Sequence, residues 1–230
     1  MELEIHALVN QERAQFGLEP LKYNPDLANV ARDHSINLAQ KNMPLTDPEI
    51  YCHEIFIHHE GFDFGLYEAD RLMNRSIYYF DVAGENIFMT SSWSELIPAD
   101  PGLAPCIGEL EIVEVYDDPD LVMEDYETLL EYARTARRTN WTDAEWLSQV
   151  EIGETVVEGW MESPGHRANI LESRFDEEGI GVAKINDFII VTEVLISRAE
   201  CGYPDAKCCE DAYGLFCYEP WDCRGKICRQ

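Results

Sequence analysis

The chain has 230 residues, of which 46% are hydrophobic and 11% aromatic. This composition excludes an intrinsically disordered chain, and the length suffices for a sizeable core in one domain plus a small extension. Acidic residues number 45 against 17 basic ones, which gives a formal net charge of -28. Such a surface repels phosphate groups, so nucleic acid and anionic lipid headgroups are poor candidate partners. No apolar run approaches the length that spans a membrane.

The cysteines point to an oxidising compartment. Six of the eight lie between Cys201 and Cys228, a density that predicts a disulfide framework. The rival interpretation, a zinc knuckle, is disfavoured because this segment contains no Cys-x-x-Cys pair and no histidine. Cys52 and Cys106 could bond to each other or each to the tail. The predicted disulfide cysteines are Cys52, Cys106, Cys201, Cys208, Cys209, Cys217, Cys223 and Cys228. Since the first residues resemble no signal peptide, we expect a mature exported chain whose signal is missing from this sequence.

Two helices are predicted at the N-terminus. Residues 2–16 carry apolar side chains at helical spacing, and Gly17 ends the run. Asn24 followed by Pro25 is typical of a helix start, and the apolar periodicity then continues to about Lys41. His34 lies on this apolar stripe, which favours a buried, hydrogen-bonded core histidine over a ligand.

Residues 43–83 are rich in loop-forming residues and contain neighbouring histidines, His58 and His59. Asp70-Arg71-Leu72 fits a short helix. The segment Gly84-Glu85-Asn86-Ile87 then places a carboxylate and an amide beside a glycine. On structural grounds alone it reads as a turn with a solvated glutamate.

Residues 91–152 resemble an insertion, with prolines and an acidic turn in the first half. A helix is predicted from about Leu121 to Arg138. Thr142-Asp143-Ala144-Glu145 has the pattern of a capping box, so we expect it to open another helix.

An amphipathic helix with Val156 and Trp160 on its apolar face follows, and Ser163-Pro164-Gly165 breaks it directly before His166. A histidine placed by a helix break suits either a ligand or a structural corner. Residues 179–185 and 188–196 are predicted as two strands joined by a turn at Asn186-Asp187.

The order of these motifs resembles the CAP superfamily, the SCP-like extracellular domain, in its prokaryotic branch. The segments that carry the resemblance are Val30–Ser35, Asp70-Arg71-Leu72, Gly84–Ile87, Gly159-Trp160-Met161 and Ser163–Leu171. It covers about residues 2–90 and 153–197. It implies an α/β fold, an α-β-α sandwich, with a small disulfide-rich C-terminal extension, and it implies export. We therefore expect a CAP-like domain at 1–197, with the insertion at about 91–152, and a disulfide-stapled tail at 198–230.

The resemblance also implies a cleft with two histidines and two acidic residues that can bind a divalent metal. By motif, Glu85 is one acid and His166 is one histidine. The other histidine is His58 by the aromatic-x-His pattern or His59 by its distance to Gly65, and both stay candidates. The second acid is absent at Ser163, and Glu162 is one residue out of register.

Histidine and carboxylate ligands favour zinc, and a zinc-bound water could act as a nucleophile. The metal candidates are thus His58, His59, Glu85 and His166, and Glu85 is the candidate catalytic base. We expect a secreted binding or interaction module whose partner is a small apolar ligand, a peptide or an envelope component. The alternatives are a metal-dependent extracellular hydrolase that uses the same cleft, and a structural envelope or adhesion protein.

Overall fold

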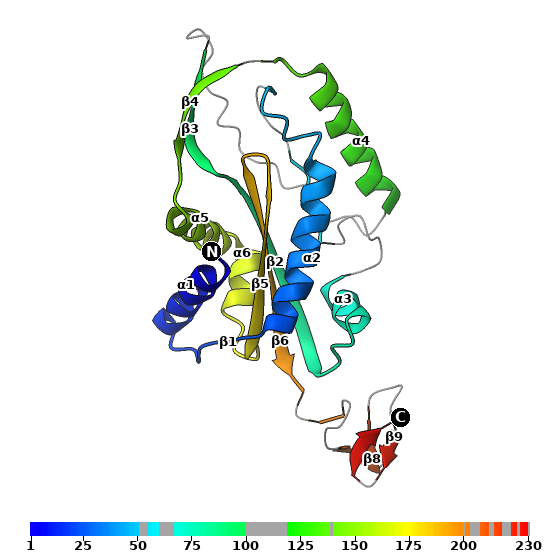
Figure 1. Ribbon diagram of the computed structural model, residues 1–230. Helices are drawn as coiled ribbons and strands as arrows, with labels where there is room; N and C mark the ends of the chain where they lie inside the picture. Colours follow the sequence, from blue (N-terminus) through cyan, green and yellow to red (C-terminus); the bar gives the residue numbers. More distant parts are fainter. Residues whose placement is uncertain are drawn as a thin grey trace.

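The computed structural model describes residues 1–50, 55–59, 67–99, 119–138 and 140–199, and in the tail 201–202, 208–211, 214–217, 222–224 and 226–229 (Figure 1). The helices are α1 (Glu2–Gln15), α2 (Pro25–Asn42), α3 (Glu68–Asn74), α4 (Pro119–Thr135), α5 (Gln149–Glu162) and α6 (Pro164–Ile170). The longer strands are β2 (Phe80–Ser91), β3 (Trp93–Pro98), β4 (Trp141–Trp146), β5 (Glu177–Ile185) and β6 (Phe188–Arg198). The short strands are β1 (Lys22–Tyr23), β7 (Cys209–Asp211), β8 (Gly214–Phe216), β9 (Asp222–Arg224) and β10 (Ile227–Arg229).

The four-stranded central sheet has the order β1-β5-β6-β2, with β1 parallel to β5 and the other pairs antiparallel. Helices α2 and α3 lie on one face, and α1, α5 and α6 lie on the other (Figure 1). The predicted α-β-α sandwich is therefore confirmed, together with a disulfide-bonded C-terminal segment. Strand β2 forms one edge of the sheet, and this position is central to the candidate site.

Strand β6 is buried on both faces, which explains its nearly continuous apolar sequence. Val191 and Leu195 join the core beneath α1 and α5, whereas Val194 and Ile196 join the core beneath α2. The alternation follows from the two-residue period of a strand. One carboxylate, Glu193, interrupts this apolar run and is fully buried.

The N-terminal predictions are confirmed. Asn24 caps α2: its side-chain oxygen accepts hydrogen bonds from the backbone N–H groups of Asp26 (2.9 Å) and Leu27 (3.4 Å). Pro25 occupies the first turn, where a missing N–H costs nothing. Gly17 takes a positive φ of 71° just after α1, a conformation that glycine adopts without strain.

Two local interpretations were wrong. Residues 83–87 are not a turn but part of the edge strand β2, and Glu85 is buried rather than solvated. Thr142–Glu145 does not open a helix, since it pairs with β3 as strand β4. The helix start lies six residues further on, where Ser148 and Glu151 form a capping box. The cross-strand partners on β3, remote in sequence, stabilise β4 over the helical alternative.

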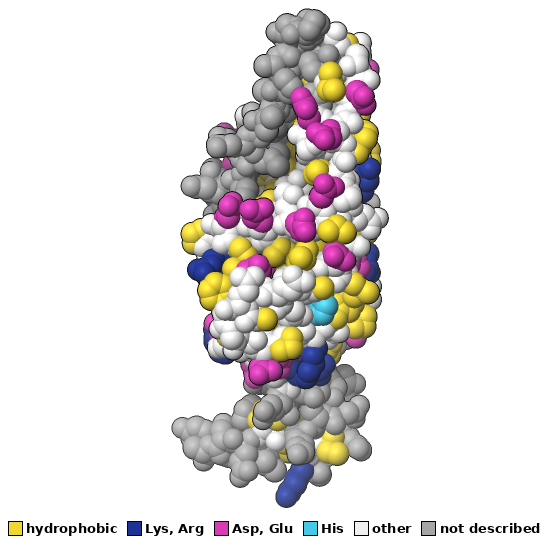
Figure 2. Space-filling model, turned by 90° about the vertical axis from the view of Figure 1, so that its left-hand side faces the viewer, with side chains coloured by type: hydrophobic (Ala, Val, Ile, Leu, Met, Phe, Trp, Pro, Cys, Tyr) yellow, Lys and Arg dark blue, Asp and Glu magenta, His cyan; other side chains and the backbone are white. Residues whose placement is uncertain are grey.

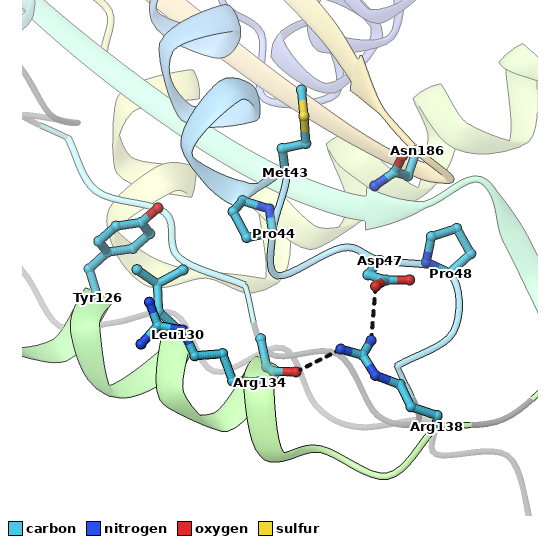
Figure 3. Close-up of a pocket in the computed structure, with 10 residues that line it drawn as sticks. Met43, Pro44, Asp47, Pro48, Tyr126, Leu130, Arg134, Arg138 and Asn186 are labelled. Atoms are coloured by element: carbon cyan, nitrogen blue, oxygen red, sulfur yellow. Dashed lines mark hydrogen bonds and ion pairs between the residues drawn. The ribbon is translucent and has the colours of Figure 1, made fainter.

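Helix α4 packs onto the last turn of α2 and the segment that follows it. The Tyr126 hydroxyl donates to the backbone oxygen of Lys41 (2.8 Å), and the Arg138 guanidinium bridges Asp47 (2.9 Å) and the Ala133 carbonyl (3.2 Å). Between the two segments lies a cavity of about 630 Å³, lined also by Met43 (Figure 3). The insertion boundaries at 91–152 stay a prediction.

All six tail cysteines are bonded to one another, as Cys201–Cys209, Cys208–Cys223 and Cys217–Cys228. The tail thus offers no partner to Cys52 or Cys106, which lie outside the described residues. Peptide mapping without reduction should recover these three pairs, and reduction with alkylation should then label all six sulfurs. A tail peptide alkylated before reduction would contradict the pairing. Within the described residues, no helix is long and apolar enough to cross a bilayer.

Candidate functional site

The Gly-Glu-Asn motif lies on the edge strand β2, where successive side chains point to opposite faces. Glu85 points toward α2 and α3, whereas Asn86 points toward α6 and β6. Because β2 is the last strand of the sheet, groups from both helical layers can approach each other around its outer edge. The motif therefore connects the two layers at this edge.

The Glu85 carboxylate, with 1% of its side chain exposed, is held by three basic groups. Arg71 of α3 donates a hydrogen bond to Oε2. Nδ1 of His59 lies 3.0 Å from Oε1, and Nε2 of His34 lies 3.8 Å from the same oxygen. Arg71 also donates to the backbone oxygen of His59 (2.8 Å), which fixes this histidine relative to the carboxylate.

These contacts keep Glu85 ionised. Burial acts to raise the pKa of Glu85, but the neighbouring His34, His59 and Arg71 outweigh it and lower the pKa to about 2. Burial lowers the pKa of His34 to about 4, so His34 is neutral near pH 7. In neutral solution the ionised form of Glu85 therefore depends on Arg71 and on the hydrogen bond from His59.

Of the two histidines that sequence left open, the structure brings His59 to Glu85. His58 is 2% exposed, and its ring stacks on Phe56 with the centroids 6.0 Å apart. The side chain of His59 is 27% exposed. His34 is buried, as the sequence predicted, but a helical stripe does not show that it faces the Glu85 carboxylate. The sequence reasoning also assigned no role to Arg71, although Arg71 lies in a segment that carries the family resemblance.

His166 lies in the first turn of α6, which begins at Pro164 directly after the helix break. Two amides tie this helix to the motif on β2. Asn169 donates to the Glu85 carbonyl (3.0 Å) and to Asn86 Oδ1 (2.8 Å), and Asn86 donates to the His166 carbonyl (3.2 Å). The two motifs singled out in the sequence are therefore bonded directly to each other.

The imidazole of His166 is partly buried, and its Nδ1 has no hydrogen-bond partner among the described residues. Burial lowers the pKa of His166 to about 4, and the charge of His59 lowers it further. His166 is thus a neutral ring near pH 7 whose Nδ1 is unengaged among the described residues, and it lies close enough to His59 for the two rings to interact electrostatically.

Glu162, the other candidate acid, lies apart from this cluster. It is exposed on α5 and lines a groove of about 450 Å³ against α1, together with Leu8 and Met161. Figure 2 shows acidic side chains spread over this side of the molecule with few basic ones between them. A second acid that interacts with the cluster is Glu68 of α3: burial raises its pKa, and the charge of Glu85 raises it further.

The described residues contain one close group of metal-type ligands, the sulfurs of Cys208, Cys217 and Cys228. All three sulfurs belong to disulfides and lack the thiolate charge that binds a metal. No three carboxylate or imidazole groups around Glu85 approach one another as closely, within the part of the chain that the structure describes.

A three-layer domain with a Gly-Glu-Asn edge strand tied to a histidine after a helix break defines a CAP-type domain. The model of the cysteine-rich secretory protein family, CAP, matches residues 6–78 and 126–193, which is more than half of the chain. The chain belongs to this family, which comprises extracellular proteins. No curated protein matches it.

Three similar solved structures are bacterial. An extracellular SCP-domain protein of Bacillus anthracis is 19% identical, with 86% of this chain and 40% of that chain covered and a TM-score of 0.48. An outer surface protein of Borrelia burgdorferi is 14% identical, with coverages of 84% and 90% and a TM-score of 0.45. A cysteine-rich secretory protein of Staphylococcus aureus is 14% identical, with coverages of 85% and 38% and a TM-score of 0.41. The chain thus spans about two fifths of the Bacillus and Staphylococcus proteins.

Proposed function

We propose that this chain is an exported binding module whose His59 and His166 take a divalent cation, with zinc as the preferred ion. The observation that carries the proposal is the unpartnered Nδ1 of His166 beside a histidine whose own Nδ1 is engaged by Glu85. An ionised carboxylate only accepts, so His59 donates its Nδ1–H and keeps Nε2 as a lone pair. The neutral ring of His166 offers a second nitrogen lone pair to the cation.

Glu85 then orients a ligand and is not itself one. Metal-binding histidines commonly donate their other N–H to a carboxylate, which fixes the ring and its tautomer. Both oxygens of Glu85 are already engaged, one by Arg71 and one by His59. Two imidazoles leave coordination positions for water or for a group of a bound partner. A zinc ion held in this way could link the module to its partner.

The alternative, a metal-dependent hydrolase with Glu85 as general base, has less support. A general base works best with a pKa near the working pH, and the pKa of Glu85 is lowered to about 2. Its oxygens are also paired and buried, so a substrate water would compete with Arg71 for them. These features favour binding over catalysis.

Export is supported by the three tail disulfides, because such bonds persist in oxidising compartments. The partner classes that suit an extracellular module of this kind are a small apolar ligand, a peptide or an envelope component. A structural role in the envelope is the third possibility, and binding of the purified chain to isolated envelopes would distinguish it.

Zinc titration tests the proposed ion site. We expect His166→Ala and His59→Ala each to weaken zinc binding at least tenfold in calorimetry, because each removes one of two protein ligands. Glu162→Ala is the matched control, since it removes a charged group from a neighbouring element and should leave the zinc affinity unchanged. Equal zinc binding by the wild type and both histidine variants would refute the site.

A separate assay tests the hydrolase alternative. We expect the wild type to leave a mixture of unstructured peptides intact, with and without zinc. Glu85→Gln should lower the zinc affinity, because the orienting carboxylate is lost. Peptide turnover that Glu85→Gln abolishes would overturn the binding-only proposal in favour of catalysis.

A further inference from the structure

The β3–β4 ribbon extends from one end of the central sheet (Figure 1) and forms one wall of a second cavity. This cavity has a volume of about 410 Å³ and is lined by Trp141 and Trp146 of β4, by Glu49 and by Asp187 of the β5–β6 turn. None of the residues of the Glu85 cluster lines it. Trp146 is 57% exposed, which is a large apolar surface to leave in water.

Both indoles face the same cavity because of a bulge. Five positions separate Trp141 from Trp146, and in a regular strand their side chains would point to opposite faces. Pro98 pairs with Trp141 and Ile97 pairs with Asp143, so Thr142 is an extra residue in β4. One extra residue restores a common face, and bulges that re-aim side chains are frequent beside binding sites.

The ring of Trp141 is also fixed in position, because its Nε1 donates to the Pro48 carbonyl (2.8 Å). A ring that is already held loses little freedom when a ligand binds. The cavity therefore combines one anchored indole with one exposed indole.

Among the described residues that line the cavity, every charged side chain is acidic: Glu49, Asp143 and Asp187. Within the same part of the chain, none of these three carboxylates forms an ion pair. In a chain with a net charge of -28, this cavity repels anions and attracts cations. The carboxylates do not form a close ligand cluster within the part of the chain that the structure describes, so the arrangement does not suit a chelated metal ion.

We propose that this cavity binds a bulky organic cation, a quaternary ammonium group of the choline class. Indole faces attract such cations through the ring quadrupole, and carboxylates at a distance add long-range attraction without requiring desolvation. A quaternary ammonium donates no hydrogen bond and presents methyl groups, which suits two indole surfaces. The cavity is separate from the proposed zinc site, so the two proposals can fail independently.

Calorimetric titration with choline chloride at low ionic strength, corrected against sodium chloride, tests the proposal. The neutral isostere 3,3-dimethylbutan-1-ol has the same shape without the charge. We expect choline to bind at least tenfold more tightly than this alcohol, and Trp146→Ala to weaken choline binding at least tenfold. Phe16→Ala removes a similarly exposed aromatic ring, 50% exposed, directly after α1, and should leave choline binding unchanged.

The carboxylates give a second test that leaves the indoles in place. Asp143→Asn keeps the oxygen that accepts from the Ala144 N–H (2.8 Å) and removes only the charge. We expect this variant, combined with Asp187→Asn, to weaken choline severalfold without affecting the alcohol. Equal affinities for choline and its isostere would show an apolar pocket only. Binding of a neutral oligosaccharide such as chitotetraose, without binding of choline, would show a sugar site. Either outcome overturns the proposal.

Discussion

Replacing Gly181 by alanine should remove a large share of the stability of the domain. A Cβ atom at this position would lie 2.0 Å from the Arg32 nitrogen and 2.2 Å from the Ala31 carbonyl carbon, both in the backbone of α2. Backbone atoms cannot turn aside as a side chain can, so α2 would have to lift from β5. The Ser35 hydroxyl, which donates to the Gly181 carbonyl (3.0 Å), would lose this contact.

We expect a loss of about 3 kcal/mol or more, at or above the upper end of the usual cost of overpacking a core, because the neighbours are backbone atoms that cannot rotate away. This is a large share of the 5–15 kcal/mol, roughly, that stabilises a typical domain. Urea denaturation followed by circular dichroism measures the change. Gly165→Ala is the matched control, since nothing lies within 4 Å of its added Cβ. A Gly181→Ala midpoint equal to that of the control would show that α2 does not approach β5 so closely.

The sequence predicted the layers of the fold because each one depends on local signals. The Asn24 cap and the following proline fixed the start of α2, and the Asn186-Asp187 turn fixed the hairpin of β5 and β6. The edge strand β2 escaped prediction because Gly84 and Asn86 lower its strand propensity. Its eleven paired positions on β6 outweigh that propensity, and they are remote in sequence.

The site was predictable only in part, for a similar reason. Motif resemblance pointed to Glu85 and His166, whereas the choice between His58 and His59 required the packing of Phe56 against His58. Arg71 and His34 reach Glu85 through tertiary contacts that no spacing rule encodes. The buried carboxylate of β6 was recognisable in the sequence, because Glu193 is the one charged residue within an apolar run.

Glu178 of β5 and Glu193 of β6 form a fully buried pair on the sheet face beneath α1. One oxygen of each is engaged: Glu178 Oε1 contacts His6 Nδ1, and Glu193 Oε2 accepts from Asn86 (2.6 Å). The remaining oxygens, Glu178 Oε2 and Glu193 Oε1, have no other partner among the described residues. Two ionised carboxylates in this position would repel each other, so the pair is stable only while it holds a proton.

Burial raises the pKa of Glu178 to about 7. Burial, followed by the charge of Glu178, raises the pKa of Glu193 well above its usual value. The positive charge of Arg13 of α1 lowers the pKa of both carboxyl groups, but less than burial raises them. The other titratable neighbours are His6 of α1, whose own pKa is lowered by burial, and Tyr23 of β1. The folded state thus binds more protons than the unfolded state from pH 4.5 up to about 7 and beyond. Over this range the pair makes stability fall as pH rises.

Glu193→Gln should therefore stabilise the protein at pH 8. The glutamine oxygen can still accept from Asn86, and its N–H group can donate to Glu178 Oε2, so the pair no longer needs a shared proton. Since one pKa unit corresponds to about 1.4 kcal/mol, we expect a gain on the order of 2 kcal/mol at pH 8 and little change at pH 5.

Urea denaturation of the wild type and Glu193→Gln at pH 5, 6, 7 and 8 measures this difference. Glu158→Gln, on the exposed face of α5, removes the same formal charge without touching the pair. We expect the control to follow the pH dependence of the wild type, because one exposed acid among 45 changes the overall repulsion only slightly. If the unfolding free energies of Glu193→Gln and Glu158→Gln changed in the same way between pH 5 and pH 8, the two buried carboxylates would not share a proton. The acidic surface as a whole would then determine the pH dependence.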